Sequence, residues 1–388
     1  MNQVVDQNYD LCICGGGIAG LVTAYALGKS GRKVLVVEKN AHFNANGADV
    51  LKPSGIEVLE KLGLLKDLFN MGAIKRDKVL IYYAGELVSE MDYRHEHIKK
   101  YFMLIPYSSV LAMMLNAIRK IDNIHFMFNT ELTSARIDER TGSIDQVVLN
   151  ERIFIRAKVY VAADGIFSKL RSLLNVSTSI EKYTQQMYFA QLPMVESVKL
   201  VNRLYVDSNH MLAYFYPVGK DHFRSVIGMP KECGDYHFVE NRSAALLRNR
   251  LSGFVTDSDD ALEAITTLDK YVTFPVCKMN LDTYYKGNVV FIGNAAHAVH
   301  PITGQGMNLA IEDAGTLYPL VIDYFKGLLE LESVFEKYQH LRHDTNDMIV
   351  RYGDNLVNNF HTKNSFLTHL NLKLQSSNRK LQASLQGV

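Results

Sequence analysis

The residues most able to do chemistry in this sequence are the glycines and amides of residues 288–314. Four apolar residues, 289–292, predict a buried strand, and Gly293 and Asn294 predict the turn that follows it. A glycine-punctuated loop then leads into residues 308–314, which contain no helix breaker and predict a helix. A helix start presents unpaired N–H groups and the positive end of the helix dipole. This loop therefore suits a phosphate, or an electron-rich ring that becomes an anion.

A second glycine-rich turn, near the start of the chain, has the spacing of a dinucleotide site. Three glycines follow the pattern G-x-G-x-x-G: Gly15, Gly17 and Gly20. The pattern predicts a strand before them over residues 9–14 and a helix after them over 21–29. The next predicted strand, 33–38, ends in Glu38, where a carboxylate would hold a ribose hydroxyl. A merely structural turn would not explain Glu38, so we predict a dinucleotide fold, with NAD and FAD fitting equally well.

A third turn follows the apolar run 159–163. Asp164 and Gly165 form it, and Ser168 is well placed to cap the helix that begins there. An Asp-Gly pair alone often means no more than a turn. Because it ends a buried strand in a chain with two other nucleotide-type loops, we interpret it as part of the same site.

Length and composition limit the remaining possibilities. The chain has 388 residues, enough for two domains or one large α/β body with an inserted lobe, and 47% of them are hydrophobic. Its 42 basic and 41 acidic residues nearly cancel, so no electrostatic feature favours nucleic acid or anionic lipid as a partner. The first ten residues lack the pattern of a signal peptide, and glycines interrupt the apolar run 11–28, so we predict no membrane span.

The cysteines indicate a reducing compartment. There are four: Cys12, Cys14, Cys233 and Cys277. Two of them share one predicted buried strand, which argues against a disulfide framework and favours the cytoplasm.

The middle of the chain predicts a second layer. Residues 79–91 and 185–230 are rich in aromatic residues and alternate as strands do. Tyr214 and Tyr216 share one face under a period of two, and they would line a pocket for a flat aromatic ligand or form a core-facing ladder. We predict an α/β fold with a Rossmann-like domain on a mixed parallel sheet and an inserted antiparallel-sheet substrate domain. The first domain takes residues 1–78, 98–180 and 276–388, and the second takes 79–97 and 181–275.

The three turns resemble, in their order and residue sequence, those of the FAD-dependent aromatic hydroxylases, the single-component group related to 4-hydroxybenzoate hydroxylase. The resemblance extends over nearly the whole chain, and residues 47–55, 202–208, 213–217 and 300–314 are most similar to the branch that hydroxylates the amino group of 2-aminobenzoylacetate in alkyl-quinolone N-oxide biosynthesis. It implies FAD as cofactor and O2 and a small aromatic molecule as substrates. The expected product is a ring-hydroxylated phenol or an N-hydroxylated aniline of secondary metabolism, made through a C4a-hydroperoxyflavin.

The resemblance also implies roles for single residues. The glycines of the first motif would lie at the FAD pyrophosphate and Glu38 at the ribose, while Pro301 and the loop from Gly304 to Asn308 would enclose the isoalloxazine. No side chain is assigned as nucleophile or general base, because the flavin does the chemistry. The cofactor-binding residues expected are Gly15, Gly17, Ile18, Ala19, Gly20, Glu38, Lys39, Lys52, Asp164, Gly165, Gly293, Asn294, Pro301, Gly304, Gln305, Gly306, Met307 and Asn308. The substrate-binding residues expected are Arg203, Tyr205, Tyr214 and Tyr216.

Two positions depart from the family pattern. Asn294 stands where the family has Asp, which predicts looser FAD binding because charge assistance to a ribityl hydroxyl is lost. Tyr107 stands where the family has a flavin-contacting arginine, and Lys52 would supply the missing charge. His297 and His300 have no evident further ligands around them, so we expect structural histidines and no metal.

The electron source stays open. No second G-x-G-x-x-G exists for NAD(P)H, so the reductant either reaches the same cleft transiently or arrives as reduced flavin from a flavin reductase. Three other functions remain to be separated from a monooxygenase. A flavin halogenase usually has a tryptophan-rich motif, whereas this chain has no Trp. The others are a dehydrogenase of the geranylgeranyl reductase type and an FAD-binding protein without activity.

Overall fold

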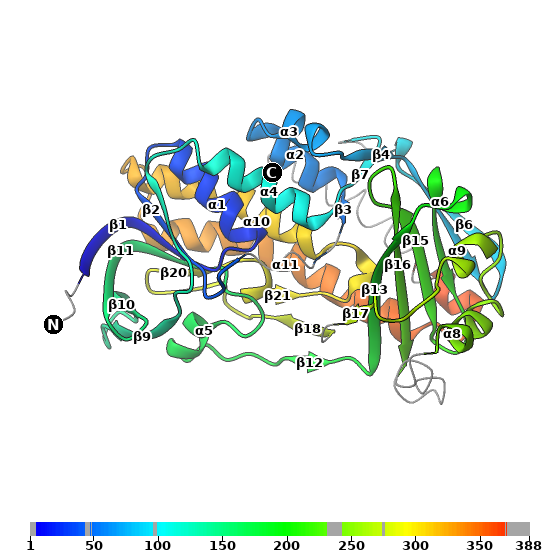
Figure 1. Cartoon of the computed structure of the whole chain (residues 1–388). Helices are drawn as coiled ribbons and strands as arrows, with labels where there is room; N and C mark the ends of the chain where they lie inside the picture. Colours follow the sequence, from blue (N-terminus) through cyan, green and yellow to red (C-terminus); the bar gives the residue numbers. More distant parts are fainter. Residues whose placement is uncertain are drawn as a thin grey trace.

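The structure is a computed structural model that describes residues 5–42, 47, 49–95, 99–230, 243–273, 276–368 and 370. Two large sheets lie at opposite ends of an elongated molecule, and helices fill the space between them (Figure 1).

The first sheet is largely parallel. Its central strands run in the order β20-β11-β1-β2-β8, and every neighbouring pair among them is parallel. Their bounds are β1 (Val5–Cys14), β2 (Val34–Val37), β8 (Ile124–Met127), β11 (Ile153–Ala162) and β20 (Val289–Phe291). Three short antiparallel strands extend it: β9 (Leu132–Ile137), β10 (Ile144–Leu149) and β19 (Tyr285–Lys286).

The register of this sheet brings the three predicted turns together. Ala162 at the end of β11 pairs with Cys14 of β1 on one side and with Phe291 of β20 on the other. Parallel strands end at the same edge of a sheet, so the turns that follow these three strands are neighbours. Residues 15–20, 163–168 and 292–296 therefore form one rim although they are far apart in the sequence.

Helices cover this sheet and carry the rim. Residues 18–28 of α1 (Ile18–Lys29) are all buried, as expected for small and apolar side chains between a sheet and other helices. α10 (Gly306–Phe325) packs against α1, α2 (Pro53–Lys61) and α11 (Leu331–Asn358). The remaining helices of this part are α3 (Leu65–Asn70), α4 (Tyr107–Ile118) and α5 (Lys169–Leu173).

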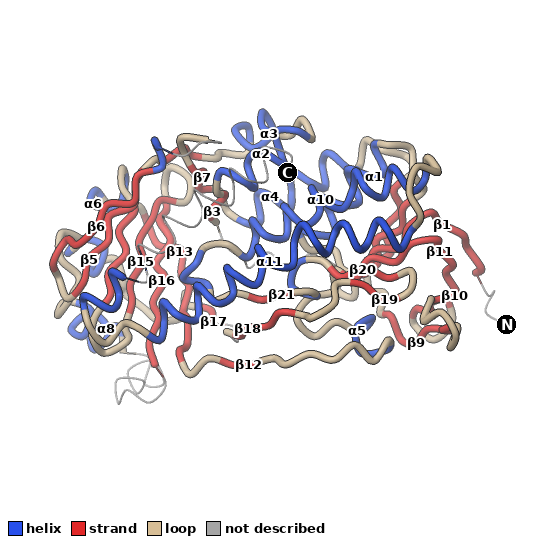
Figure 2. The backbone as a smooth tube through the Cα atoms, turned by 180° about the vertical axis from the view of Figure 1, so that it is seen from behind, coloured by secondary structure: helices blue, strands red, loops and turns tan. Residues whose placement is uncertain are grey.

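The second sheet has seven strands in the order β17-β13-β16-β15-β14-β5-β6. All its pairs are antiparallel except β14 with β5. Its strands are β5 (Lys78–Tyr83), β6 (Glu86–Asp92), β13 (Gln185–Pro193), β14 (Asn202–Val206), β15 (Leu212–Pro217), β16 (His222–Pro230) and β17 (Val272–Thr273). Three helices lie on its outer side: α6 (Glu196–Lys199), α8 (Ala244–Leu251) and α9 (Asp259–Glu263) (Figure 1). Figure 2 shows α6 and α8 from behind.

Two small sheets lie between the large ones. One contains β3 (Val50–Leu51), β7 (Phe102–Leu104) and β4 (Ile74–Arg76), and the other contains β12 (Glu181–Lys182), β18 (Cys277–Asn280) and β21 (His297–Ala298). The predicted α/β class, with a parallel sheet and an antiparallel one, is confirmed. The domain boundaries remain a prediction. No helix within the described ranges combines the length and the apolar character that crossing a membrane requires.

Candidate active site

The first glycine turn is shaped by close backbone contacts. Gly15 has a φ of +109°, and a Cβ on it would lie 2.2 Å from the carbonyl oxygen of Ala163. A Cβ on Gly20 would lie 2.1 Å from the carbonyl oxygen of Gly15, so this glycine lets α1 approach the turn. Gly17, in contrast, faces a cavity, and the nearest atom to its Cβ would be the Tyr107 hydroxyl at 4.0 Å. Ile18 and Ala19 line the same cavity.

Glu38 is held at the end of β2. Its carboxylate accepts a 2.9 Å hydrogen bond from the N–H of Gly16 and a 2.9 Å bond from the N–H of Asn40. The side chain thus bridges the glycine turn and the residues after β2, where the ribose was expected. Lys39 is exposed, and neither it nor Glu38 lines the cavity.

The Asp-Gly turn contributes both a ligand-facing and a structural residue. Gly165 lines the cavity. Asp164 accepts from the N–H of Lys169 at 2.7 Å through one oxygen, while its other oxygen is buried and has no hydrogen-bond partner in the described part of the chain. Burial raises the pKa of Asp164. Arg171 ties this turn to the next one by donating to the carbonyl oxygen of Ala295 at 2.9 Å.

The Gly-Asn turn rests on a buried carboxylate. Asp313 accepts from the N–H of Gly293 at 2.9 Å, from His297 Nε2 at 2.6 Å and from Arg342 Nε at 2.8 Å. Burial opposes the charge, but His297 and Arg342 together lower the pKa of Asp313 below its ordinary value. Asn294 is exposed toward the cavity from this anchored turn.

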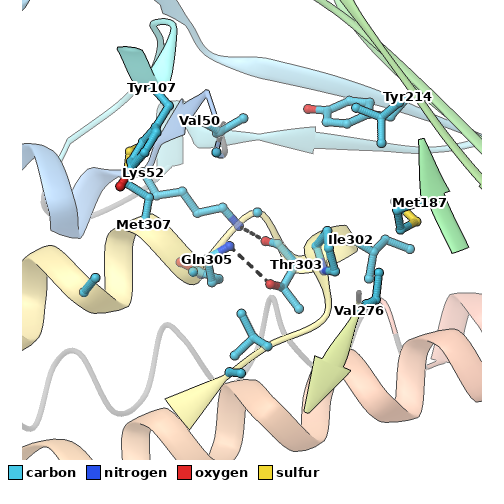
Figure 3. Close-up of a pocket in the computed structure, with 18 of the residues that line it drawn as sticks. Val50, Lys52, Tyr107, Met187, Tyr214, Val276, Ile302, Thr303, Gln305 and Met307 are labelled. Atoms are coloured by element: carbon cyan, nitrogen blue, oxygen red, sulfur yellow. Dashed lines mark hydrogen bonds between the residues drawn. The ribbon is translucent and has the colours of Figure 1, made fainter. Parts of the chain in front are cut away.

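The loop before α10 is fixed by Lys52 and Asn308. The Lys52 ammonium donates to the carbonyl oxygen of Thr303 at 2.7 Å (Figure 3). Asn308 is fully buried: its side chain accepts from the N–H of Lys52 at 2.7 Å and donates to the carbonyl oxygen of Gly304 at 3.0 Å. It fastens the loop to β3 and does not line the cavity, because these bonds turn its amide away. The cavity-lining residues here are Lys52, Pro301, Gly304, Gln305, Gly306 and Met307.

Tyr107 lies across the mouth of the first glycine turn. Its hydroxyl accepts a 3.3 Å hydrogen bond from the N–H of Ile18, in the first turn of α1. Its ring covers Gly47, where a Cβ would come within 2.6 Å of the ring carbons. Burial raises the pKa of Tyr107, so the phenol is neutral at ordinary pH. The N–H of Ile18, at the start of α1, is therefore hydrogen-bonded to a neutral hydroxyl and is not free to bind a phosphate.

Residues from each of these turns, together with Tyr107, border one cavity of about 780 Å³. It runs from the glycine and Asp-Gly turns, past Lys52 and the loop before α10, to the inner face of the seven-stranded sheet. In Figure 3 Lys52, Thr303 and Gln305 lie on one side, and Met187 and Tyr214 lie on the other. The cavity thus joins a polar backbone-lined end to an aromatic and aliphatic end.

Tyr214 and Tyr216 line the aliphatic end, as predicted from their shared face, with ring centroids 4.7 Å apart. Asn202 donates to the Tyr214 hydroxyl at 3.1 Å, and burial raises the pKa of Tyr214 to about 12. The Tyr216 hydroxyl donates to Asp49 at 3.2 Å. Asp49 also accepts from Arg224 through Nε at 2.6 Å and Nη2 at 3.1 Å.

The predicted substrate contacts of Tyr205 and Arg203 are not supported. Neither residue lines the cavity, because alternation along β14 places both on the outer face of the sheet while Leu204 faces the cavity. Tyr205 is fully buried beneath the outer helices, stacks on Tyr82 at 4.6 Å and shares a 2.8 Å hydrogen bond with Ser258. Its role is in the core.

The histidines and cysteines have local roles. His300 Nδ1 accepts from the N–H of Ile302 at 3.2 Å, and burial lowers the pKa of His300 to about 3, so this ring is neutral. No group of three potential metal ligands lies together within the described ranges. Cys12, Cys14 and Cys277 are free thiols, and Cys233 lies outside the described residues.

A family model described as FAD binding domain matches residues 8–352. The chain belongs to this family. Its structure superimposes on that of PqsL, a probable FAD-dependent monooxygenase from Pseudomonas aeruginosa, crystallised in complex with 2-aminobenzoylacetate. The TM-score for this complex is 0.90, with 37% identity over 94% of this chain and 100% of the other.

Two curated relatives support the same class. The 6-methylpretetramide 4-monooxygenase of Streptomyces rimosus is 26% identical, covering 81% of this chain and 75% of the relative. The 6-hydroxynicotinate 3-monooxygenase of Bordetella bronchiseptica is 25% identical, covering 86% and 87%. The predictions of an FAD cofactor and of a monooxygenase are confirmed, and the dehydrogenase alternative is not favoured.

The residues of the cavity fit FAD. The open faces of Gly17 and Gly165 and the first-turn amides of α10 lie along one extended space, which suits a dinucleotide with a ring at its far end. No sequence pattern predicted a role for five residues that hold the site together: Asp49, Arg171, Arg224, Asp313 and Arg342. Of these, only Asp313 could have been noticed from the sequence, because its carboxylate interrupts the apolar face of the helix between Ala310 and Leu317.

Proposed function

We propose that this FAD-dependent monooxygenase hydroxylates an electron-rich aromatic compound, a phenol at the ring or an aniline at the nitrogen, in the cytoplasm. One observation carries the proposal: the space suited to the flavin opens directly onto an aromatic and aliphatic pocket roofed by Tyr214 and Tyr216. FAD, when bound, supplies the redox chemistry by which one oxygen atom of O2 reaches the substrate.

The protein's own residues bind, orient and exclude water. The loop from Pro301 to Met307 and the start of α10 would support the isoalloxazine, and Lys52 adds a buried positive charge beside it. A reduced flavin ring is anionic, so a buried ammonium and helix-terminal amides stabilise it. The aliphatic side chains at the other end of the cavity keep the reaction space dry, which protects a reactive oxygen species from water.

Electrons can reach FAD by one of two routes. Either NAD(P)H enters the same cleft briefly, or a flavin reductase delivers reduced flavin. The position of Tyr107 favours the second route, because its hydroxyl occupies the Ile18 amide and so weakens retention of the diphosphate.

The test measures O2 consumption by the purified enzyme with FAD and NADPH, FAD and NADH, or chemically reduced FAD, over a panel of phenols and anilines. Under ¹⁸O2 the expected product gains one ¹⁸O atom, detected by mass spectrometry. Product formed without O2 would identify a dehydrogenase, and flavin binding without any turnover would identify a binding protein. Either result would contradict the proposal.

A further inference from the structure

Formal charge in the cavity is confined to its cofactor end. Among the described residues that line the cavity, Lys52 is the only one with a charged side chain. Its ammonium is bonded to Thr303 in the loop before α10, on the side opposite Tyr214 in Figure 3. The substrate end presents apolar side chains from the seven-stranded sheet, among them Val79, Ile81, Met187, Leu204, Leu212 and Val226.

The guanidinium of Arg224, on the seven-stranded sheet, is already paired with a carboxylate. Arg224 lies on the strand face that carries Val226, but two of its nitrogens bind Asp49, which is fully buried. Asp49 also accepts hydrogen bonds from the Tyr216 hydroxyl and from the N–H of Tyr107. A ligand carboxylate placed near Arg224 would therefore meet a fixed carboxylate as well as a guanidinium.

The polar groups that remain are neutral. Burial raises the pKa of Tyr214 to about 12 and raises the pKa of Tyr352, and it raises the pKa of the Cys277 thiol. Such groups can hydrogen-bond a carbonyl, an amide or a hydroxyl. They cannot balance a full negative charge, and an ionised carboxylate loses most of its solvation when it enters an apolar pocket.

We propose that the substrate is an uncharged, hydrophobic phenol or aniline that carries no carboxylate or phosphate. This inference rests on the proposed function and specifies its substrate class. It separates this chain from two of its relatives, because 2-aminobenzoylacetate and 6-hydroxynicotinate are both carboxylates.

Equilibrium dialysis with isosteric pairs tests the inference without turnover. The pairs are 4-aminobenzamide with 4-aminobenzoate, and 4-hydroxybenzamide with 4-hydroxybenzoate, against the full chain with and without saturating FAD at pH 7. The expected result is binding of each amide at least about tenfold more tightly than its carboxylate. Equal or tighter binding of the carboxylates, or no binding of any amide, would overturn it.

A matched pair of variants sharpens the test. Leu204→Arg places a cation on the pocket face of β14, and Leu204→Met keeps that position neutral. The arginine variant should shift the carboxylate-to-amide affinity ratio toward the carboxylate by at least about tenfold, while the methionine variant keeps the wild-type ratio. Thermal melts verify folding, and the wild-type comparison stands if Leu204→Arg does not fold. An unchanged ratio in a folded Leu204→Arg protein would overturn the inference.

Failure of this inference is distinguishable from failure of the proposed function. Amide-selective binding without ¹⁸O incorporation would refute the monooxygenase reaction and leave the charge selectivity intact. Carboxylates that bind tightly and become oxygenated would refute the charge selectivity and leave the reaction intact.

Discussion

The Lys52 ammonium and the Thr303 carbonyl oxygen are 2.7 Å apart although the residues are separated by 251 positions in the sequence. This bond places a buried positive charge against the loop that leads into α10. Among the described residues that line the cavity, Lys52 is the only one with a charged side chain, and it lies at the cofactor end.

Replacing Lys52 by Met should weaken binding of reduced FAD more than binding of oxidised FAD. We expect a loss of about tenfold for the reduced form, about 1.4 kcal/mol, because the charge that balances the anionic ring is gone. Anaerobic titration measures both affinities. Lys66→Met, an exposed lysine on α3, is the control. An equal loss for both forms would show that Lys52 acts only through packing.

Tyr107→Phe should tighten FAD binding. The variant removes the hydroxyl that accepts from the Ile18 N–H at 3.3 Å and frees this amide for the diphosphate. One neutral hydrogen bond predicts a gain of about threefold to fivefold in affinity, measured by fluorescence titration. Tyr25→Phe, on the same helix as Ile18, is the control. A weaker affinity in Tyr107→Phe would mean that the hydroxyl itself binds the cofactor.

Asn294→Asp should also tighten FAD binding, by about fivefold or roughly 1 kcal/mol, because a carboxylate accepts more strongly than an amide from a ribityl hydroxyl. The same change at Asn175, an exposed turn residue that does not line the cavity, should leave the affinity unchanged. Calorimetric titration measures the FAD affinity of both variants. Weaker binding by Asn294→Asp would contradict the prediction.

Tyr214→Phe should alter substrate binding, whereas Tyr205→Phe should alter stability. The first removes a hydroxyl that Asn202 fixes at the cavity, so KM for the aromatic substrate should rise about threefold to tenfold with little change in stability. The second removes a hydroxyl bonded to Ser258 and the Thr256 carbonyl, so stability should fall by about 1–2 kcal/mol with KM unchanged. Steady-state kinetics and urea unfolding separate the two, and a raised KM in Tyr205→Phe would contradict the assignment of faces.

Asp313→Asn should destabilise the fold by about 1–3 kcal/mol at pH 7, because buried Arg342 loses one of its two carboxylate partners and keeps only Glu312. The folded-state pKa of Asp313 lies below its ordinary value of 3.8, so its contribution is complete above that value and is lost as pH falls toward the folded pKa. The difference in free energy of unfolding between wild type and variant should stay constant from about pH 8 to 5 and narrow below about pH 4. Asp344→Asn, with a side chain 84% exposed, is the control. A pH-independent difference would contradict the ionised state of Asp313.

The sequence allowed the cofactor side of the fold to be predicted because its signals are local. Strand, glycine turn and helix follow one another within about thirty residues at Gly15 to Glu38, and the parallel sheet then brings the other two turns beside it. The helix predicted over residues 308–314 lies within α10.

The substrate side was predicted less well because its signals are not local. A period of two correctly paired Tyr214 with Tyr216, but it does not say which face of β14 meets the cavity, so Arg203 and Tyr205 were assigned to the wrong one. The bond between Arg224 and Asp49 joins residues 175 positions apart, and no spacing rule anticipates it.

The Asp313 contacts also set the order in which the protein can become functional. The carboxylate that supports Gly293 is itself held by Arg342 and Asn346 of α11, which are made after nearly nine-tenths of the chain. A nascent or truncated polypeptide that ends before this helix lacks the groups that secure the turn at Gly293 and Asn294. We therefore expect cofactor loading to follow synthesis of α11, and shortened translation products to be recovered without flavin.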